Sequence, residues 1–392
     1  MPTRLVRPLG AIGALLLASC RSQLVPVPSC GAAPCHWEEL ARVVDSAVHD
    51  GAAPGAVVAV SVRGERFIHA TGRIGFEETA PAGPGTVYDL ASLTKVVALT
   101  TLTMMAVDQG LIHLEDSVGH YLPGFAGGAK TGVTIRHLLT HSSGLPAHRA
   151  LWRDAPTAAA AIPLVISTPL DTVPGAQMVY SDLGAIILTQ IVEQVFGQPI
   201  DRLFATKVAG PLGLKSTRFL PPKSWIKRIA PTERDPWRGR LIRGEVHDEN
   251  AAFLGGRSGH AGLFSTAEDL IRFGEWLLRQ REAGGPESPS GPRISSAVVR
   301  EFTRRQELVR GSTRALGWDT PSPGSSAGTR ISAESFGHTG FTGTSIWLDP
   351  SRGLVVVLLT NRVNPTRDNA RLGPLRPLVA DKVVDLLGTG SR

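Results

Sequence analysis

Residues 96–106 form an apolar stretch with almost no polar face, and this stretch most constrains the fold of the chain. A helix of that composition is typical of a position where it is buried on all sides. A chain of 392 residues, of which 42% are hydrophobic, can supply the large core that such a helix needs. Lys95 opens the run, so we expect it to lie away from the ordinary surface.

Ser92 and Lys95 lie three residues apart at the start of this run. Positions i and i+3 share a face of a helix, which predicts that the amine of Lys95 lies beside Oγ of Ser92. A neutral amine there can take the serine proton as the hydroxyl attacks a carbonyl. The backbone N–H of Ser92, at a helix N-terminus, favours a developing oxyanion. The spacing alone also marks many helix starts with a solvated lysine, so the rest of the chain must decide.

Tyr180, Ser181 and Asp182 stand at a second loop-to-helix junction, before the apolar residues 183–195. The phenol of Tyr180 can pass a proton. Its other interpretation is a half-buried aromatic residue whose hydroxyl bonds to backbone.

His338, Thr339 and Gly340 come shortly before two β-rich runs, residues 345–348 and 353–360. The runs are separated by turn residues, so the three residues are predicted on or beside a sheet strand.

In this order, S-x-x-K, Y-S-[ND] and [KH]-T-G resemble the motifs of the penicillin-recognising serine hydrolases, which include class C β-lactamases, DD-peptidases and related esterases. Residues 138–145 and 262–270 are similar to two further segments of that family, and the resemblance covers about residues 36 to 385. It implies an α+β fold in which an antiparallel sheet flanked by helices faces a mainly helical lobe, with the active site between the lobes. We expect one catalytic domain over residues 36–388.

The resemblance implies that Ser92 is the acylated nucleophile and Lys95 its base or proton relay. Tyr180 would protonate the leaving group and later help to activate the deacylating water. Asp182 departs from the asparagine common in class C β-lactamases, and a carboxylate there should favour the charged form of Lys95.

The same resemblance implies that the substrate-binding and oxyanion residues are His338, Thr339, Gly340 and Phe341. Thr339 and Gly340 would line the strand along which the substrate lies, and the N–H of Phe341 would complete the oxyanion hole with that of Ser92. His338 stands where many members carry lysine.

Residues 245–252 and 255–262 look like a pattern of the penicillin-binding protein 4B-like carboxypeptidases and of serine hydrolases associated with cell-wall recycling. This favours a D-alanyl-D-alanine carboxypeptidase or muropeptide hydrolase. An esterase or a β-lactamase is the alternative within the enzymes, because the same nucleophile serves ester, amide and lactam carbonyls. A penicillin-binding sensor or scaffold that acylates without turnover is the alternative of another class, which Asp182 keeps open.

His247, Asp248, Glu249 and His260 carry side chains of the metal-ligand type, but their spacing is a poor zinc signature. We expect a hydrogen-bonded loop wall that borders the pocket, no metal and no cofactor. His141 is expected to organise a turn.

The first twenty residues resemble a bacterial lipoprotein signal peptide. Arg4 and Arg7 precede the apolar residues 11–18, a run too short to span a bilayer. Residues 17–20 fit a lipobox, which makes Cys20 the predicted lipid anchor. A targeting helix with an accidental cysteine is the alternative.

Residues 21–35 are predicted to be a tether. Arg21 and Ser22 follow the lipobox cysteine in place of Asp, which favours the periplasmic face of the outer membrane in a Gram-negative host. Cys30 and Cys35 form either a disulfide or two free thiols, and the sequence leaves both open.

The formal charge of +7 is a mild excess for this length, and the basic residues of 300–310 are interrupted by acidic ones. A solvated helix face explains them better than a nucleic-acid surface. The charge suits anionic lipid or wall polymers, and we expect a monomer. Residues 55–70 predict a hairpin with its turn near Gly64, and residues 92–280 predict a mainly helical half.

Overall fold

The computed structural model describes residue 1 and residues 29–30, 33–34, 36–282 and 291–388. Its main sheet has five antiparallel strands in the order β10-β11-β12-β3-β4. The N-terminal hairpin is therefore joined to the C-terminal strands. The strands are β3 (Gly55–Val62), β4 (Glu65–Gly72), β10 (Phe336–Thr339), β11 (Ser345–Asp349) and β12 (Leu354–Thr360).

The turn of the first hairpin lies where the sequence predicts it. Val62 pairs with Glu65, and the two residues between them, Arg63 and Gly64, have φ angles of 52° and 92°. Two consecutive positive φ angles are the geometry of a type I′ turn, whose twist matches that of the flanking strands.

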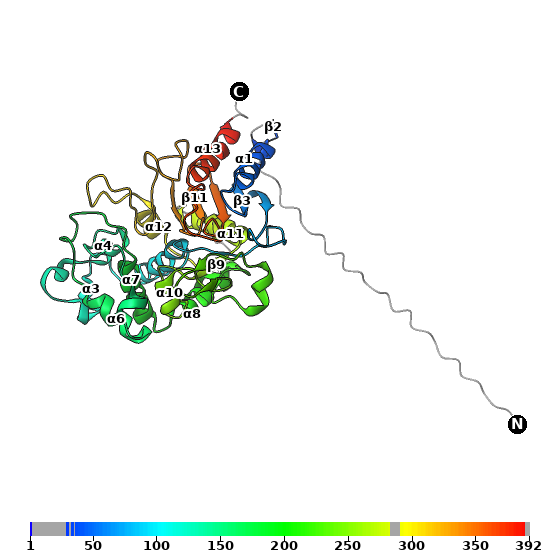
Figure 1. Cartoon of the computed structure of the whole chain (residues 1–392). Coiled ribbons are helices and arrows are strands. Elements are labelled where there is room, and N and C mark those ends of the chain that lie inside the picture. Colours follow the sequence, from blue (N-terminus) through cyan, green and yellow to red (C-terminus); the bar gives the residue numbers. More distant parts are fainter. Residues whose placement is uncertain (2–28, 31–32, 35, 283–290, 389–392) are drawn as a thin grey trace.

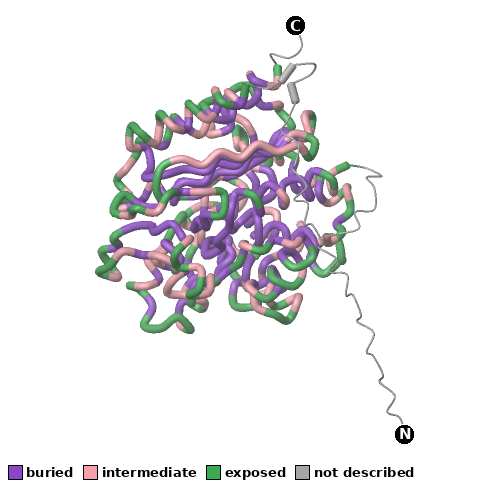
Figure 2. Tube along the Cα trace, turned by 90° about the vertical axis from the view of Figure 1, so that its right-hand side faces the viewer, coloured by how far each residue is buried: buried purple, intermediate pink, exposed green. Residues whose placement is uncertain are grey.

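Helices cover both faces of the sheet. Alternate residues of β3 point to opposite faces: Val58 and Val60 pack with α1 (Trp37–His49) and α13 (Leu375–Gly388). Val57 and Ala59 join the larger core, to which α11 (Ala267–Arg281) contributes. Figure 1 shows α1 and α13 side by side above the sheet and α11 below it, and Figure 2 shows the inner strands as a buried layer with the more exposed edge strand beside them.

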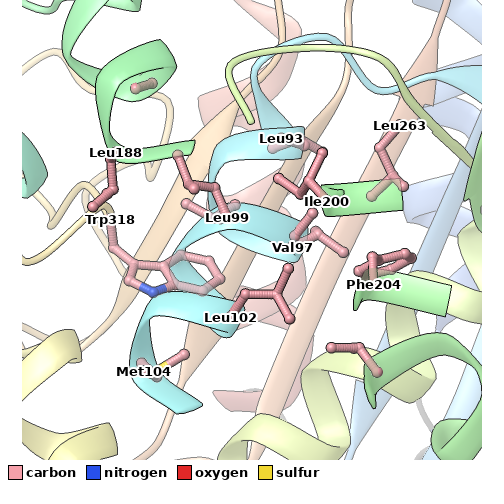
Figure 3. Close-up of a cluster of buried hydrophobic side chains, with 14 of the residues drawn as sticks. Leu93, Val97, Leu99, Leu102, Met104, Leu188, Ile200, Phe204, Leu263 and Trp318 are labelled. Carbon is pink, nitrogen blue, oxygen red and sulfur yellow. The ribbon is translucent and has the colours of Figure 1, made fainter. Parts of the chain in front are cut away.

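The predicted central helix is present, but its first part is wider than an α-helix. Residues Lys95–Thr100 form a π-helix, η1, which continues as α2 (Thr101–Asp108). Every residue from 95 to 106 is buried. Figure 3 shows why: Leu188 and Trp318 lie beside Leu99, whereas Ile200, Phe204 and Leu263 lie on the side of Val97.

The mainly helical lobe surrounds this helix and is confirmed for most of residues 92–280. Its last helix, α11, packs against β12 and β3 and therefore covers one face of the main sheet. A small sheet of β5 (Tyr88–Asp89), β9 (Leu263–Ser265) and β6 (Arg218–Phe219), in that order, ties the segment before the nucleophile to the rest of the lobe.

The remaining helices are α3 (Val118–Tyr121), η2 (Pro123–Phe125), η3 (Gly128–Gly132), α4 (Ile135–Leu139), α5 (Leu151–Asp154), α6 (Ala158–Ser167), α7 (Asp182–Phe196), α8 (Ile200–Phe204), η4 (Ala205–Ala209), α9 (Gly210–Leu212), η5 (Lys223–Arg228), α10 (Glu249–Phe253) and α12 (Ser296–Thr303). The short strands are β1 (Ser29–Cys30), β2 (Ala33–Pro34), β5 (Tyr88–Asp89), β6 (Arg218–Phe219), β7 (Arg234–Asp235), β8 (Arg240–Leu241) and β9 (Leu263–Ser265).

The predicted lipidation site Cys20 and the thiol of Cys35 lie outside the described residues, as does most of the predicted signal peptide and tether. The side chain of Cys30 is not described either, so the disulfide and the anchor stay predictions. None of the helices in the described part of the chain has the length and apolar composition that a membrane-spanning helix needs.

Candidate active site

Ser92 stands at the entrance of the central helix, after a strained residue. Ala91 has a φ of 45°, a left-handed conformation that is costly for a residue with a Cβ atom. The buried carboxylate of Asp89 holds it there, because Oδ1 accepts the N–H of Ala91 at 2.8 Å. Oδ2 accepts the N–H of His247 at 2.6 Å. Burial raises the pKa of Asp89 despite these two hydrogen bonds.

Lys95 lies beside Ser92, as the helical spacing predicts. Its Nζ donates to Oγ of Ser92 at 3.0 Å and to the carbonyl oxygen of His260 at 3.0 Å, and it lies 2.7 Å from Oδ1 of Asp182. Burial by itself lowers the pKa of Lys95, but Asp182 and Tyr180 outweigh it and raise the pKa above its usual value. The group is therefore an ammonium at neutral pH, as Asp182 led us to expect.

Tyr180 faces this ammonium from the loop before α7. Its ring centroid is 4.9 Å from Nζ of Lys95 and 4.4 Å from the ring of His141. The N–H of Ser181 donates to Nδ1 of His141 at 3.1 Å. His141 thus does more than organise its own turn, because it also fixes the segment that carries Tyr180.

The predicted substrate strand lies on the other side of Ser92. Ser92, Tyr180, His338 and Phe341 line one cavity of about 460 Å³. Gly340 is fixed by close packing: a Cβ atom there would lie 2.3 Å from the carbonyl oxygen of Leu90. The strand therefore approaches the nucleophile segment as closely as only glycine allows.

His338 is neutral, and its tautomer follows from its partner. Burial lowers its pKa well below the usual value, and the charges of Arg314 and Lys95 add to this effect. Nδ1 lies 2.7 Å from the carbonyl oxygen of Thr339, which can only accept, so Nδ1 carries the proton. Nε2 is then a bare acceptor, and it is buried without a hydrogen-bond partner among the described residues.

A second cavity, of about 520 Å³, shares Ser92, Tyr180 and Phe341 with the first. Trp152 and His148 line it, together with the predicted wall residues His247, Asp248 and Glu249. The nucleophile thus lines two spaces, each large enough for part of a substrate.

The wall is a hydrogen-bonded network. Nε2 of His247 lies 2.8 Å from Glu233, and Arg367 contacts both Glu233 and Glu249 at 2.7 Å. Burial raises the pKa of Glu233, but His247 and Arg367 lower it to about 2. No group of three or more His, Cys, Asp or Glu side chains within the described ranges is arranged to hold a metal ion.

Arg314 is a site residue that sequence reasoning missed. It lines the first cavity with Ser92, and its guanidinium carbon lies 5.1 Å from the ring centroid of Tyr180. Among the described residues, no hydrogen-bond partner reaches its buried Nε and Nη1 atoms. No motif marks this arginine, because its role depends on a loop that folds back against Tyr180.

Two other cavity arginines donate to backbone carbonyl oxygens, although the buried Nε of Arg376 also has no hydrogen-bond partner among the described residues. Arg362 donates to the carbonyl oxygen of Phe341, and Arg376 donates to those of Gly340 and Thr344. Asp319 also lines the cavity, but its carboxylate accepts from Thr313 and from its neighbour's N–H, in keeping with a structural role.

Comparisons with known proteins agree with this fold and geometry. A model of the family described as beta-lactamase matches residues 40–381. An Escherichia coli K12 protein named "Putative D-alanyl-D-alanine carboxypeptidase" is 34% identical over 323 residues, which are 74% of this chain and 72% of that protein.

Two solved structures share the fold. A penicillin-binding protein homologue from Caulobacter crescentus has a TM-score of 0.71 at 20% identity, over 92% of this chain and 98% of its own. A class C β-lactamase from Rhodobacter sphaeroides has a TM-score of 0.67 at 21% identity, over 88% of this chain and 99% of its own. The length of the family match and the identity to the E. coli relative together show that the chain belongs to the β-lactamase family.

Proposed function

We propose that this β-lactamase-family hydrolase is a D-alanyl-D-alanine carboxypeptidase or muropeptide hydrolase that forms an acyl-enzyme at Ser92. The observation that carries the proposal is the guanidinium of Arg314 in the cavity beside Ser92, whose buried Nε and Nη1 have no hydrogen-bond partner among the described residues. A carboxypeptidase substrate ends in a free carboxylate one residue beyond the scissile bond. Arginine is well suited to bind such a group, because its planar fork matches the two carboxylate oxygens.

The position of Arg314 also fits the direction of the reaction. Its guanidinium lies against Tyr180, so a carboxylate bound there would bring the leaving nitrogen to the side of the cavity where the phenol lies. The acyl part of the substrate would extend into the second cavity, which Trp152 and Glu249 line. The name of the E. coli relative supports the same substrate class.

The chemistry follows from the groups in contact. Oγ of Ser92 attacks the carbonyl carbon, the C–N bond breaks and an ester forms on Ser92. The serine proton ends on the leaving nitrogen, passed along Lys95 and Tyr180. The N–H groups of Ser92 and Phe341 would stabilise the oxyanion. Water then hydrolyses the ester and releases the acid.

The test compares two peptides that differ only at the C-terminus. The domain over residues 36–388 is incubated with N-acetylated Lys-D-Ala-D-Ala and with its C-terminal amide, and released D-alanine or D-alanine amide is measured. We expect Ser92-dependent cleavage of the acid and at least tenfold slower cleavage of the amide. Equal rates for the two peptides would contradict the role of the free carboxylate.

Arg314→Gln should remove the preference for the acid, whereas Arg310→Gln should leave it unchanged. Arg310 is an exposed arginine on the same segment, outside both cavities, so it controls for the loss of one positive charge.

Penicillin separates the alternatives. A lasting penicilloyl adduct on Ser92, read by intact mass, supports a DD-peptidase, and a short-lived adduct with loss of the drug supports a β-lactamase. An adduct that lasts without any peptide cleavage supports the penicillin-binding sensor without turnover. The contact between Lys95 and Asp182 is the feature that keeps this alternative open. The absence of an adduct favours an esterase.

The proposed substrate belongs to the cell envelope, where the lipobox around Cys20 would place the protein. This location is a proposal from the sequence alone. Labelling of the full-length chain with a radioactive fatty acid, lost in Cys20→Ala, would test it.

A further inference from the structure

We propose that Asp248 and His260 are positioning residues that hold one of the three acceptors of the Lys95 ammonium in place. The acceptor is the backbone carbonyl of His260, which lies 3.0 Å from Nζ. The other two partners of Nζ are side chains, Oγ of Ser92 through a hydrogen bond and Oδ1 of Asp182 through an ion pair. The proposal rests on the proposed function only in assuming that Lys95 relays the proton of Ser92. It does not depend on which acyl donor the enzyme uses.

The carbonyl of His260 belongs to a loop and therefore needs an external support. Residues 258–261 lie between α10 and β9, where only an isolated bridge pairs Ser258 with Ala261. No helix or sheet ladder fixes the direction of this peptide group. Its orientation toward Lys95 must come from the side chains around it.

The side chain of His260 provides that support from both ring nitrogens. Nδ1 lies 2.7 Å from Oγ of Ser258, and Nε2 lies 2.9 Å from Oδ1 of Asp248. The ring is buried, with an exposed side-chain fraction of 1%. Burial raises the pKa of Asp248, but His260 and the N–H of Ala251 lower it below the usual value. The carboxylate is therefore ionised and accepts the proton of Nε2.

Asp248 is itself anchored to regular structure. It is the N-cap of α10, because its Oδ1 accepts the N–H of Ala251 at 2.8 Å. On the other side of the loop, the N–H of Gly259 donates to Oγ1 of Thr189 in α7 at 3.0 Å. The loop that carries the carbonyl of His260 is thus held between the N-terminus of α10 and helix α7, which begins at Asp182.

The same short segment also supports the nucleophile. The N–H of His247 donates to Asp89, which holds the strained Ala91 before Ser92. Neighbouring residues 247 and 248 therefore reach Ser92 through Asp89 and Lys95 through His260.

The experiment uses Asp248→Asn and His260→Gln in the domain over residues 36–388. Asparagine is as good an N-cap as aspartate, so Asp248→Asn keeps the start of α10. The loss of charge weakens the hydrogen bond from Nε2 of His260 to Oδ1. The assay is hydrolysis of 4-nitrophenyl acetate, corrected with Ser92→Ala, because this small ester reports on Ser92 whether or not peptides are substrates. Peptide cleavage is measured in parallel, so failure of the carboxypeptidase proposal and failure of this one are distinguishable.

Glu275→Gln is the matched control. Glu275 is also a buried carboxylate, but it pairs with Arg66 and Ser61, and none of the three lines either cavity. It should lower the melting temperature and leave kcat for the ester within twofold of the wild type.

We expect both site variants to lower kcat by at least about tenfold with KM within twofold, because misplacement of a catalytic group by about 1 Å can cost about 10²-fold. The alkaline limb of the pH profile should move to lower pH in Asp248→Asn, since a negative charge near Lys95 is lost. The other groups that face Lys95 are Asp182, Tyr180 and the neutral rings of His141 and His338, and these are unchanged.

A kcat within twofold of the wild type in both variants overturns the proposal. The proposal is also overturned if kcat falls only in proportion to the fall in melting temperature and Glu275→Gln shows the same relation. If His260→Gln does not fold, Ser258→Ala replaces it, because that change removes only the Nδ1 partner; a wild-type kcat in Ser258→Ala and Asp248→Asn then overturns the proposal.

Discussion

Nζ of Lys95 and Oδ1 of Asp182 lie 2.7 Å apart, and the two side chains have exposed fractions of 4% and 20%. This contact decides the protonation state of the amine beside the nucleophile. Because Asp182 raises the pKa of Lys95, the amine is charged at neutral pH and donates to Ser92. An ammonium cannot keep the proton of Ser92 as well, so we propose that Lys95 releases one of its own protons as it receives that of Ser92. The relay would run through the phenol of Tyr180, whose ring lies 4.9 Å from Nζ, to the leaving nitrogen.

Asp182→Asn tests this role of the ammonium. The folded-state pKa of Lys95 lies above its usual value of about 10.4, so the wild type keeps the ammonium until the pH rises above that value. Loss of the carboxylate lowers the pKa, and we expect the alkaline limb of kcat against pH to move to lower pH by about one unit or more. The measurement is kcat for a 4-nitrophenyl ester from pH 6 to 11.

The opposite result would show that the neutral amine is the base. In that case Asp182→Asn would raise activity at neutral pH, because more of Lys95 would be uncharged. Asp201→Asn is a control carboxylate at the start of α8, outside both cavities, and should leave the profile unchanged.

The buried rings of His141 and His338 predict an acid-sensitive fold. Burial lowers the pKa of both well below the usual 6.5. The unfolded chain binds protons below pH 6.5 that these two folded rings do not, so the free energy of unfolding should fall as the pH drops. Each ring contributes about 1.4 kcal/mol per pH unit. Urea unfolding at pH 7.5, 6.0 and 5.0 measures the slope.

Replacement of either ring should remove its share of that slope. His338→Gln is one test, and His141→Asn is the other, because asparagine tolerates the φ of 54° at position 141. A slope unchanged in both variants would show that other groups cause the acid sensitivity.

The fold and the main residues of the site could be predicted because local patterns define them. The apolar run after Lys95 has the composition of a buried helix, and Gly64 sits in a turn between two β-rich runs. Ser92, Tyr180 and His338 follow in an order typical of one family. Each of these signals lies within a few residues of chain, and the structure brings the three residues to one cavity.

What the sequence did not predict depends on contacts between distant segments. Arg314 reaches Tyr180 from 134 positions away only because the chain folds back, and a lone arginine before an apolar pair has no signature. The π-helical turn at Lys95–Thr100 was likewise not predicted, because its apolar residues also suit an ordinary α-helix. Side-chain networks such as His247 with Glu233 join segments whose proximity no local pattern reveals.

We expect Glu275→Ala to lower the free energy of unfolding strongly and to leave the catalytic mechanism unchanged. Its carboxylate accepts from Ser61 at 2.6 Å and from Arg66 at 2.7 Å, between α11 and the sheet. Glu275→Ala leaves a half-buried guanidinium without its partner, and removal of one member of a buried ion pair costs about 3–5 kcal/mol. Urea unfolding should show this loss. A cost below about 1 kcal/mol would mean that water replaces the carboxylate.

We expect Gly340→Ala to cause a large loss of activity and a smaller loss of stability, in contrast to Glu275→Ala. A Cβ atom at this position would lie 2.1 Å from Oγ1 of Thr344 and 2.3 Å from the carbonyl oxygen of Leu90, so the end of β10 must move away from the segment that carries Ser92. Overpacking of this kind costs about 1–3 kcal/mol, whereas a shift of about 1 Å between the N–H groups of Ser92 and Phe341 would lower kcat by about 10²-fold. Gly85→Ala is the control, because nothing lies within 4 Å of a Cβ atom there. If Gly340→Ala keeps the wild-type kcat, there are two explanations: the strand adjusts without moving Phe341, or Phe341 does not supply half of the oxyanion hole. Phe341→Pro has no N–H at this position, so its rate of acylation separates the two explanations.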